Sequence, residues 1–151
     1  MKEQIIILEN ELKRGATFLL SCSTAELNLK PSPSKWSKKE ILGHLIDSAI
    51  NNLQRFTEIQ FKDKPYKIKK YNQDALVIAN NYFNSDINEL INFWKGLNQR
   101  IIFLMKNQTE ETLNYQIEIS PAESGNLKFL MTDYVDHISH HLNQIELNIK
   151  S

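Results

Sequence analysis

Four stretches of the chain place apolar residues three and four positions apart, and this spacing constrains the fold more than any other feature. A helix turns about 100° per residue, so such spacing gathers the apolar side chains on one helix face. The stretches cover roughly residues 3–21, 37–56, 87–105 and 127–149. Only four Gly and four Pro interrupt 151 residues, which favours long helices over a turn-rich β architecture. The sequence therefore predicts an all-α protein.

Signals at the helix starts support these boundaries. Ser37 followed by Glu40 has the form of a capping box, in which each side chain accepts a hydrogen bond from the other residue's backbone, so the second helix should begin there. Ser85 or Asp86 could cap the third helix, because short polar side chains accept from free backbone N–H groups. Four amphipathic helices of this length favour a four-helix bundle.

The connections carry weaker patterns. Residues 61–82 suit a solvated loop around Pro65, followed by a short helix over residues 72–79. Between the third and fourth helices, residues 113–119 alternate apolar and polar side chains, as a short extended segment does. We therefore expect a long connection between helices three and four. No repeat or linker divides the chain, so we expect a single domain over residues 1–151.

Composition excludes several classes of protein. The net charge is zero and the pI is about 6.9, so no overall field attracts nucleic acid or anionic lipid. No apolar run approaches the ~18–20 residues that span a bilayer, and because polar Lys2 and Glu3 lead into an amphipathic segment, we expect no signal peptide. The lone Cys22 excludes an internal disulfide. We expect a cytoplasmic protein without a membrane partner.

The segment 61-FKDKPYKIKKY-71 interleaves lysines with aromatic residues, a combination that can hold phosphates and stack bases. The cluster is small and the chain is neutral overall. We therefore interpret it as a solvated loop and expect no nucleic-acid partner.

Three of the four histidines fall within five residues, in 136-DHISHHLNQI-145. On a helix, His141 lies inside the apolar arc of the fourth stretch and His137 lies on its edge. His140 is turned about 100° from His141, towards the polar side. His137 and His141, four positions apart, can therefore aim their rings at one point, and His140 cannot join them.

The fourth histidine, His44, lies in a polar row beside the apolar stripe of the second helix. A polar row of this kind suits a cleft between two helices. If the second and fourth helices are neighbours, three imidazoles meet at one point. The row consists of His44, Ser48, Asn51, Asn52 and Arg55.

Three neutral imidazoles without a charged partner suit one divalent transition metal ion. Zinc, nickel and iron fit this ligand set, with manganese less favoured. Three protein ligands leave a position for water, which is the catalytic rather than the structural arrangement. Such an ion can lower the pKa of bound water or hold a thiol as thiolate.

Other interpretations stay open at this stage. A pair of histidines four apart also arises from packing, and His44 could be a core histidine satisfied by a hydrogen bond. Two familiar metal motifs are absent. The zincin motif needs Glu directly after its first histidine, where Ile138 follows His137, and di-iron bundles use Glu three residues before His, a spacing found nowhere here.

Two segments resemble the DinB/YfiT-like superfamily. The run 36-WSKKEILGHLIDS-48 is similar to the Trp-Ser…His-Leu-x-Asp signature of that family. The run 127-LKFLMTDYVDHISHHLNQI-145 resembles its closing helix, in which two histidines four apart precede Gln-Ile. The resemblance covers nearly the whole chain, including the position of His44 far ahead of the final pair.

The resemblance implies a four-helix bundle that binds one divalent metal through His44, His137 and His141. Members of that family have been described as metal-dependent hydrolases, and some as S-transferases that join a low-molecular-weight thiol such as bacillithiol to an electrophile. We therefore expect an enzyme for small molecules, a thiol S-transferase or a hydrolase. A non-catalytic, metal-stabilised binding or stress-response module is the alternative. A homodimer through helices one and three is compatible with the sequence.

Neighbouring residues invite hypotheses without fixed roles. Asp133 or Asp136 could accept the outer N–H of a ligand imidazole, and Gln144 could line the open coordination position. Asn51 and Arg55 could meet an anionic substrate. Gly43, beside His44, costs roughly 1 kcal/mol against Ala inside a helix and could allow close approach of another helix.

Overall fold

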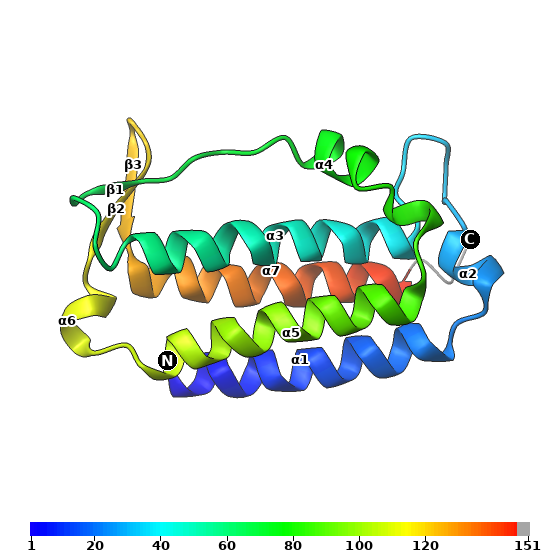
Figure 1. Ribbon diagram of the computed structural model, residues 1–151, viewed down its shortest axis with the longest axis horizontal. Coiled ribbons are helices and arrows are strands. Elements are labelled where there is room, and N and C mark those ends of the chain that lie inside the picture. Colours follow the sequence, from blue (N-terminus) through cyan, green and yellow to red (C-terminus); the bar gives the residue numbers. More distant parts are fainter. Residues whose placement is uncertain (148–151) are drawn as a thin grey trace.

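The computed structural model describes residues 1–147, and four long helices in it pack as a bundle (Figure 1). This confirms the predicted fold class. The expected end of the last helix, Ile149, lies outside the described residues. The four helices are α1 (Lys2–Ser21), α3 (Lys38–Glu58), α5 (Ile87–Lys106) and α7 (Leu127–Leu147).

The four helices form a closed ring, in which α3 and α1 each pack against both α5 and α7. In Figure 1, α1 and α7 run in one direction, whereas α3 and α5 run in the other. Since α3 and α5 are parallel neighbours, the chain between them must return along the bundle. Residues 59–86 make this crossing, which is the long connection over one side of the bundle in Figure 1. The sequence predicted this segment only as a loop with a short helix.

The crossing connection contains short elements of its own, and the helix expected over residues 72–79 is confirmed. The elements are β1 (Tyr66–Lys67), α4 (Gln73–Ala79) and the 3₁₀ helix η1 (Tyr82–Asn84). A further short helix, α2 (Thr24–Asn28), follows α1 and begins with its own capping box of Ser23 and Glu26.

The expected long connection after the third long helix is residues 107–126, and it holds α6 (Glu110–Leu113), β2 (Gln116–Ser120) and β3 (Glu123–Asn126). Strand β2 confirms the extended segment predicted near residues 113–119. The structure adds a three-stranded sheet, in which β1 pairs parallel and β3 antiparallel with β2. This sheet lies at one end of the bundle (Figure 1). It joins the crossing connection to the segment before α7.

The helix starts follow the predicted capping chemistry. Ser37 and Glu40 form a capping box at the start of α3, and the side chain of Asp86 caps α5. Inside the bundle, Trp94 is fully buried, and the Tyr134 hydroxyl donates to Asn98 Oδ1 at 2.7 Å. Since α7 and α5 lie diagonally opposite in the bundle, this buried hydrogen bond between them passes through the core.

The crossing connection is fixed to α3 by Tyr82. A Cβ atom at Gly43 would lie 2.1 Å from Tyr82 Cδ2, so only glycine leaves room for this ring against the helix. The Tyr82 hydroxyl donates to Asp47 Oδ1 at 2.6 Å, and Asn80 donates to the same oxygen at 2.9 Å. The close approach expected at Gly43 is thus made by a side chain of the connection, one residue from His44.

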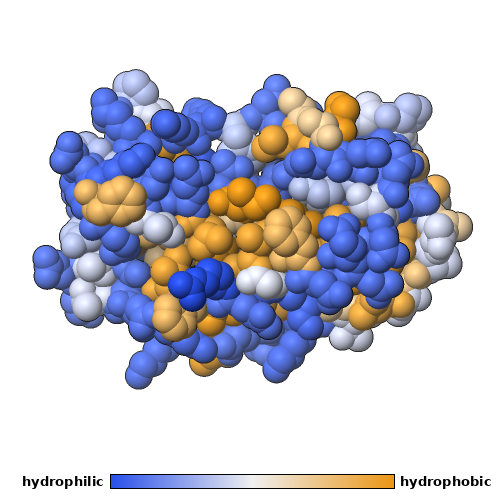
Figure 2. Space-filling view, in the orientation of Figure 1, coloured by the Kyte–Doolittle hydropathy of each residue, from blue (hydrophilic) through white to orange (hydrophobic). Residues whose placement is uncertain are grey.

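The outer surface is mainly polar with scattered apolar side chains. Figure 2 shows apolar side chains along the middle of one face, bordered by hydrophilic ones. None of the helices within residues 1–147 has an apolar stretch long enough to cross a membrane.

Candidate metal centre

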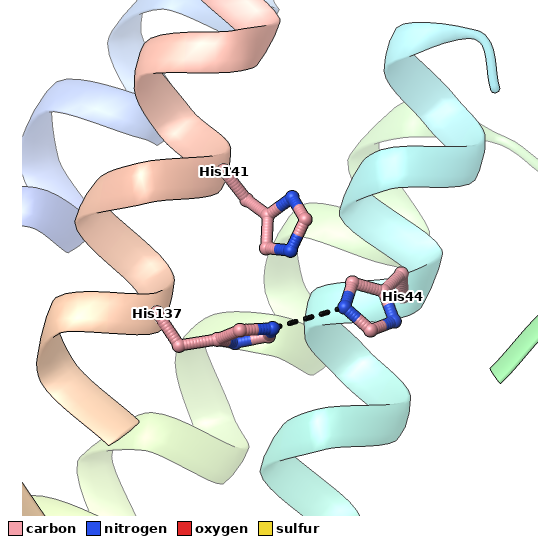
Figure 3. A group of neighbouring side chains, drawn as sticks. All are labelled: His44, His137 and His141. Atoms are coloured by element: carbon pink, nitrogen blue, oxygen red, sulfur yellow. Dashed lines mark hydrogen bonds between the residues drawn. The ribbon is translucent and has the colours of Figure 1, made fainter. Parts of the chain in front are cut away.

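The structure brings three histidines together between α3 and α7, with the three rings facing a common point (Figure 3). One ligand nitrogen from each of His44, His137 and His141 lies within 4.8 Å of the other two. The Nε2 atoms of His44 and His137 are 3.1 Å apart. The first residues of α3 lie beside the last residues of α7, because the two helices pack antiparallel. This arrangement closes the distance of more than ninety residues between His44 and the pair.

His140 stays outside this histidine cluster, as the helical count indicates. Its side chain is exposed, and its ring centroid lies 5.0 Å from that of His141. Within residues 1–147, the group of close metal-ligand atoms holds no fourth His, Cys, Asp or Glu.

Burial keeps the cluster neutral. His44 is 2% exposed, and its burial, together with the nearby His141, lowers its pKa to about 4. Burial also lowers the pKa of His137 to about 3, with further contributions from His141, His44 and His140. The pKa of His141 is lowered by burial, against the opposing effect of its hydrogen bond to Gln144. At neutral pH the rings are therefore uncharged and can offer lone pairs.

Two side chains orient the rings from outside the cluster. Gln144 Oε1 lies 2.8 Å from His141 Nδ1, and because an amide oxygen only accepts, Nδ1 carries the proton and Nε2 keeps its lone pair. Ser48 Oγ lies 3.5 Å from His137 Nδ1, a longer contact of the same kind. Such outer partners fix the tautomer and direction of metal-ligating histidines.

These outer partners differ from those that the sequence suggested. Neither Asp133 nor Asp136 forms a hydrogen bond with His137 among the described residues, and both are exposed. Gln144, considered for the open coordination position, holds His141 instead. Ser48 lies four positions after His44 on the same helix face, so its place beside the cluster could have been predicted if the pairing of α3 with α7 had been known.

Trp36, the first residue of the family signature quoted above, also contacts the site, a contact that the sequence analysis did not predict. Its ring centroid lies 5.0 Å from that of His44. The residue precedes the cap of α3, so the chain entering the helix folds back over the first turns. Its position two residues before Lys38 lies outside any helical pattern, so only its place in the signature that also contains His44 connects it with the site.

The cluster fits a divalent transition metal ion. Two ligand bonds of about 2.0 Å at the tetrahedral angle place their nitrogens about 3.3 Å apart, close to the 3.1 Å between His44 and His137. The imidazoles are neutral, two of them have outer hydrogen-bond partners, and the cluster is half-buried. These are further features of a metal site.

The fold and the cluster together define a four-helix bundle with a three-histidine site between its second and fourth long helices. Sequence comparison agrees, because the DinB superfamily profile matches residues 8–145. The chain belongs to the DinB superfamily. Among curated proteins, none matches the chain.

Solved structures share this fold. YfiT from Bacillus subtilis, described as a probable metal-dependent hydrolase with an unusual four-helix bundle topology, superposes with a TM-score of 0.88 at 20% identity, covering 97% of this chain and 84% of that one. A mycothiol-dependent maleylpyruvate isomerase superposes with a TM-score of 0.72 at 11% identity, covering 95% of this chain. This chain spans 60% of the length of the isomerase. A conserved protein from Enterococcus faecalis superposes with a TM-score of 0.73 at 14% identity, covering 97% of this chain and 93% of that one.

Proposed function

We propose that the protein is a metal-dependent enzyme for small molecules, with one divalent transition metal ion held by His44, His137 and His141. The observation that carries the proposal is the convergence of three imidazole nitrogens within 4.8 Å, with no fourth protein ligand in the group within residues 1–147. Three ligands with an open position are typical of catalytic rather than structural sites.

The ion would supply a nucleophile at neutral pH, by lowering the pKa of a bound water or thiol. The chain's own residues would do the rest. Neutral rings present their lone pairs without first losing protons, and Gln144 and Ser48 hold two of the rings in place. Burial of His44 under Trp36 limits the access of bulk water on that side.

The nucleophile is either a thiolate, in a thiol S-transferase, or a hydroxide, in a hydrolase. The names of the similar structures support both, since one is described as a probable metal-dependent hydrolase and another as mycothiol-dependent. The candidate metals are zinc, nickel and iron. In both versions the substrate is a small electrophilic molecule.

Turnover of two probes separates the versions. Metal-loaded protein is incubated with monochlorobimane and a thiol, or with 4-nitrophenyl acetate alone, beside the His137→Ala variant. Thiol conjugation that the variant lacks supports the transferase, and metal-dependent ester hydrolysis without thiol supports the hydrolase. If both activities are absent and the bound ion exchanges no added ligand, the proposal of an enzyme is contradicted. That result would favour the non-catalytic binding module.

A further inference from the structure

One of the three imidazoles in the histidine cluster has no outer hydrogen-bond partner. Gln144 Oε1 lies 2.8 Å from His141 Nδ1, and Ser48 Oγ lies 3.5 Å from His137 Nδ1. The Nδ1 atom of His44 is buried and has no hydrogen-bond partner among the described residues. Metal-ligating histidines almost always donate their second ring N–H to an outer group. The surroundings of His44 should therefore contain a group that can receive this hydrogen bond.

The Nδ1 atom of His44 faces away from the other two rings. Its Nε2 atom lies 3.1 Å from His137 Nε2, and Figure 3 shows the second ring nitrogen on the opposite side of the imidazole. The residue is 2% exposed, and the Trp36 ring centroid lies 5.0 Å from its own. A neutral imidazole that ligates through Nε2 carries its single proton on Nδ1. In the ligating state, His44 therefore has a buried donor that needs an acceptor.

Asp47 has a buried acceptor that needs a donor. Its Oδ1 atom accepts from the Tyr82 hydroxyl at 2.6 Å and from Asn80 Nδ2 at 2.9 Å. Its Oδ2 atom is buried, and no group among the described residues donates to it. Burial raises the pKa of Asp47, whereas the two donors oppose this rise and favour the ionised carboxylate. A buried polar atom without a partner costs free energy, so Oδ2 is suited to accept a further hydrogen bond.

The unpaired donor and the unpaired acceptor belong to neighbouring side chains of α3. Asp47 follows His44 by three positions, a spacing that places two Cβ atoms about 5–6 Å apart on one helix face. The two atoms form no direct hydrogen bond. Buried polar groups that lie beyond direct contact are joined by ordered water, which accepts from one group and donates to the other.

We propose that Asp47 is a positioning residue for His44, and that it acts through one buried water that accepts from His44 Nδ1–H and donates to Asp47 Oδ2. The inference rests on the proposed function, because it concerns a ring that ligates the ion. It gives all three imidazoles an outer partner. It also connects the crossing connection with the metal centre, since Tyr82 and Asn80 hold the carboxylate that orients the ring.

Asp47→Asn in the full chain tests this role. Asparagine keeps one oxygen for Tyr82 and Asn80, but its NH₂ group replaces the acceptor Oδ2 with a donor. The Kd of zinc, measured by competition with a chelating indicator, is expected to rise about tenfold or more. In nitrogen–proton NMR spectra of the zinc-loaded protein, the Nδ1 proton of His44 is expected to move upfield, because it loses a polarised hydrogen-bond partner. The Nδ1 proton of His141 should keep its position and is the internal control.

Tyr82→Phe separates positioning of the ring from anchoring of the crossing connection. The change removes one donor from Asp47 Oδ1 and weakens the anchor, but it leaves Oδ2 able to accept. Chemical denaturation should show a less stable protein. The Kd of zinc should stay within about threefold of the wild type, because the acceptor for the water is retained. An equal rise of the Kd in Tyr82→Phe and Asp47→Asn would overturn the inference and reduce Asp47 to an anchor.

Zinc binding by the wild type, with an unchanged Kd and an unchanged His44 signal in Asp47→Asn, would overturn the inference and leave the metal centre intact. Absence of zinc binding by the wild type would overturn both the inference and the proposed function. If Asp47→Asn fails to fold, the wild-type spectrum decides. It should show His44 ligating through Nε2 with a slowly exchanging proton on Nδ1, and ligation through Nδ1 would overturn the inference.

Discussion

At the scale of single residues, the orientation of two of the three imidazoles depends on a neighbour that is not itself a ligand. Gln144 accepts from His141, and Ser48 contacts His137. Helical spacing predicted that His137 and His141 point the same way, because residues four apart share a face; that His44 joins them depended on the second and fourth helices being neighbours. It could not assign the outer partners, since Ser48 lies on α3 and its contact with α7 depends on how the two helices pack.

Replacement of Gln144 by Ala is expected to weaken metal binding without unfolding the protein. Loss of an outer hydrogen-bond partner raises the metal Kd about tenfold or more, because His141 then loses its fixed tautomer. Competition with a chelating indicator measures the Kd. Asn143→Ala on the exposed side of the same helix is the matched control, and an equal effect in both variants would contradict an orienting role for Gln144.

At the scale of elements, the crossing connection is anchored to α3 beside the cluster. Tyr82 lies over Gly43 and reaches Asp47, while Asn81, with φ of 52°, turns the chain in a conformation that asparagine tolerates. The carboxyl group of Asp47 is buried, which raises its pKa, and it accepts two hydrogen bonds. This anchor sets the course of residues 59–86 near the site.

Gly43→Ala is expected to destabilise the fold, although alanine is the better helix former. The new Cβ would overlap the Tyr82 ring, and overpacking costs about 1–3 kcal/mol, beyond the ~1 kcal/mol gained in helix propensity. Chemical denaturation measures the loss. In a Tyr82→Ala background the same change should be neutral or stabilising, and an additive double variant would contradict this account.

The elements also show where sequence reasoning stops. The long helices and the caps at Ser37 and Asp86 follow from local patterns, so they were predictable. Strand β1 has only two residues and pairs with β2, about fifty positions away, with Tyr66 opposite Ile117. No local pattern specifies so short and distant a parallel pairing. The parallel course of α3 and α5 is likewise a matter of packing that periodicity does not encode.

At the scale of the whole molecule, a polar contact passes through the middle of the bundle. Tyr134 donates to Asn98, whose amide nitrogen donates to the backbone oxygen of Trp94. Both Tyr134 and Asn98 are buried, so neither can exchange its partner for water. The contact connects α7 to α5 in the core of the bundle.

Tyr134→Phe is expected to lower the free energy of unfolding by about 1–3 kcal/mol, because Asn98 Oδ1 would be left buried without a donor. Thermal or urea denaturation of metal-free protein measures this loss separately from metal binding. Tyr115→Phe, which removes a hydroxyl outside the core, is the control. An unchanged stability in Tyr134→Phe would show that the buried bond contributes nothing net.

The central claim is that imidazoles from α3 and α7 hold one ion together, and metal content of the purified protein tests it most directly. Elemental analysis is made on the wild-type protein and on His44→Ala, His137→Ala, His141→Ala and His140→Ala, after equal exposure to zinc and removal of free metal. The account predicts one ion per chain in the wild type and in His140→Ala, and loss of most of it in the other three. Retention of a full equivalent of metal by His44→Ala, or its loss in His140→Ala, would contradict the three-histidine centre.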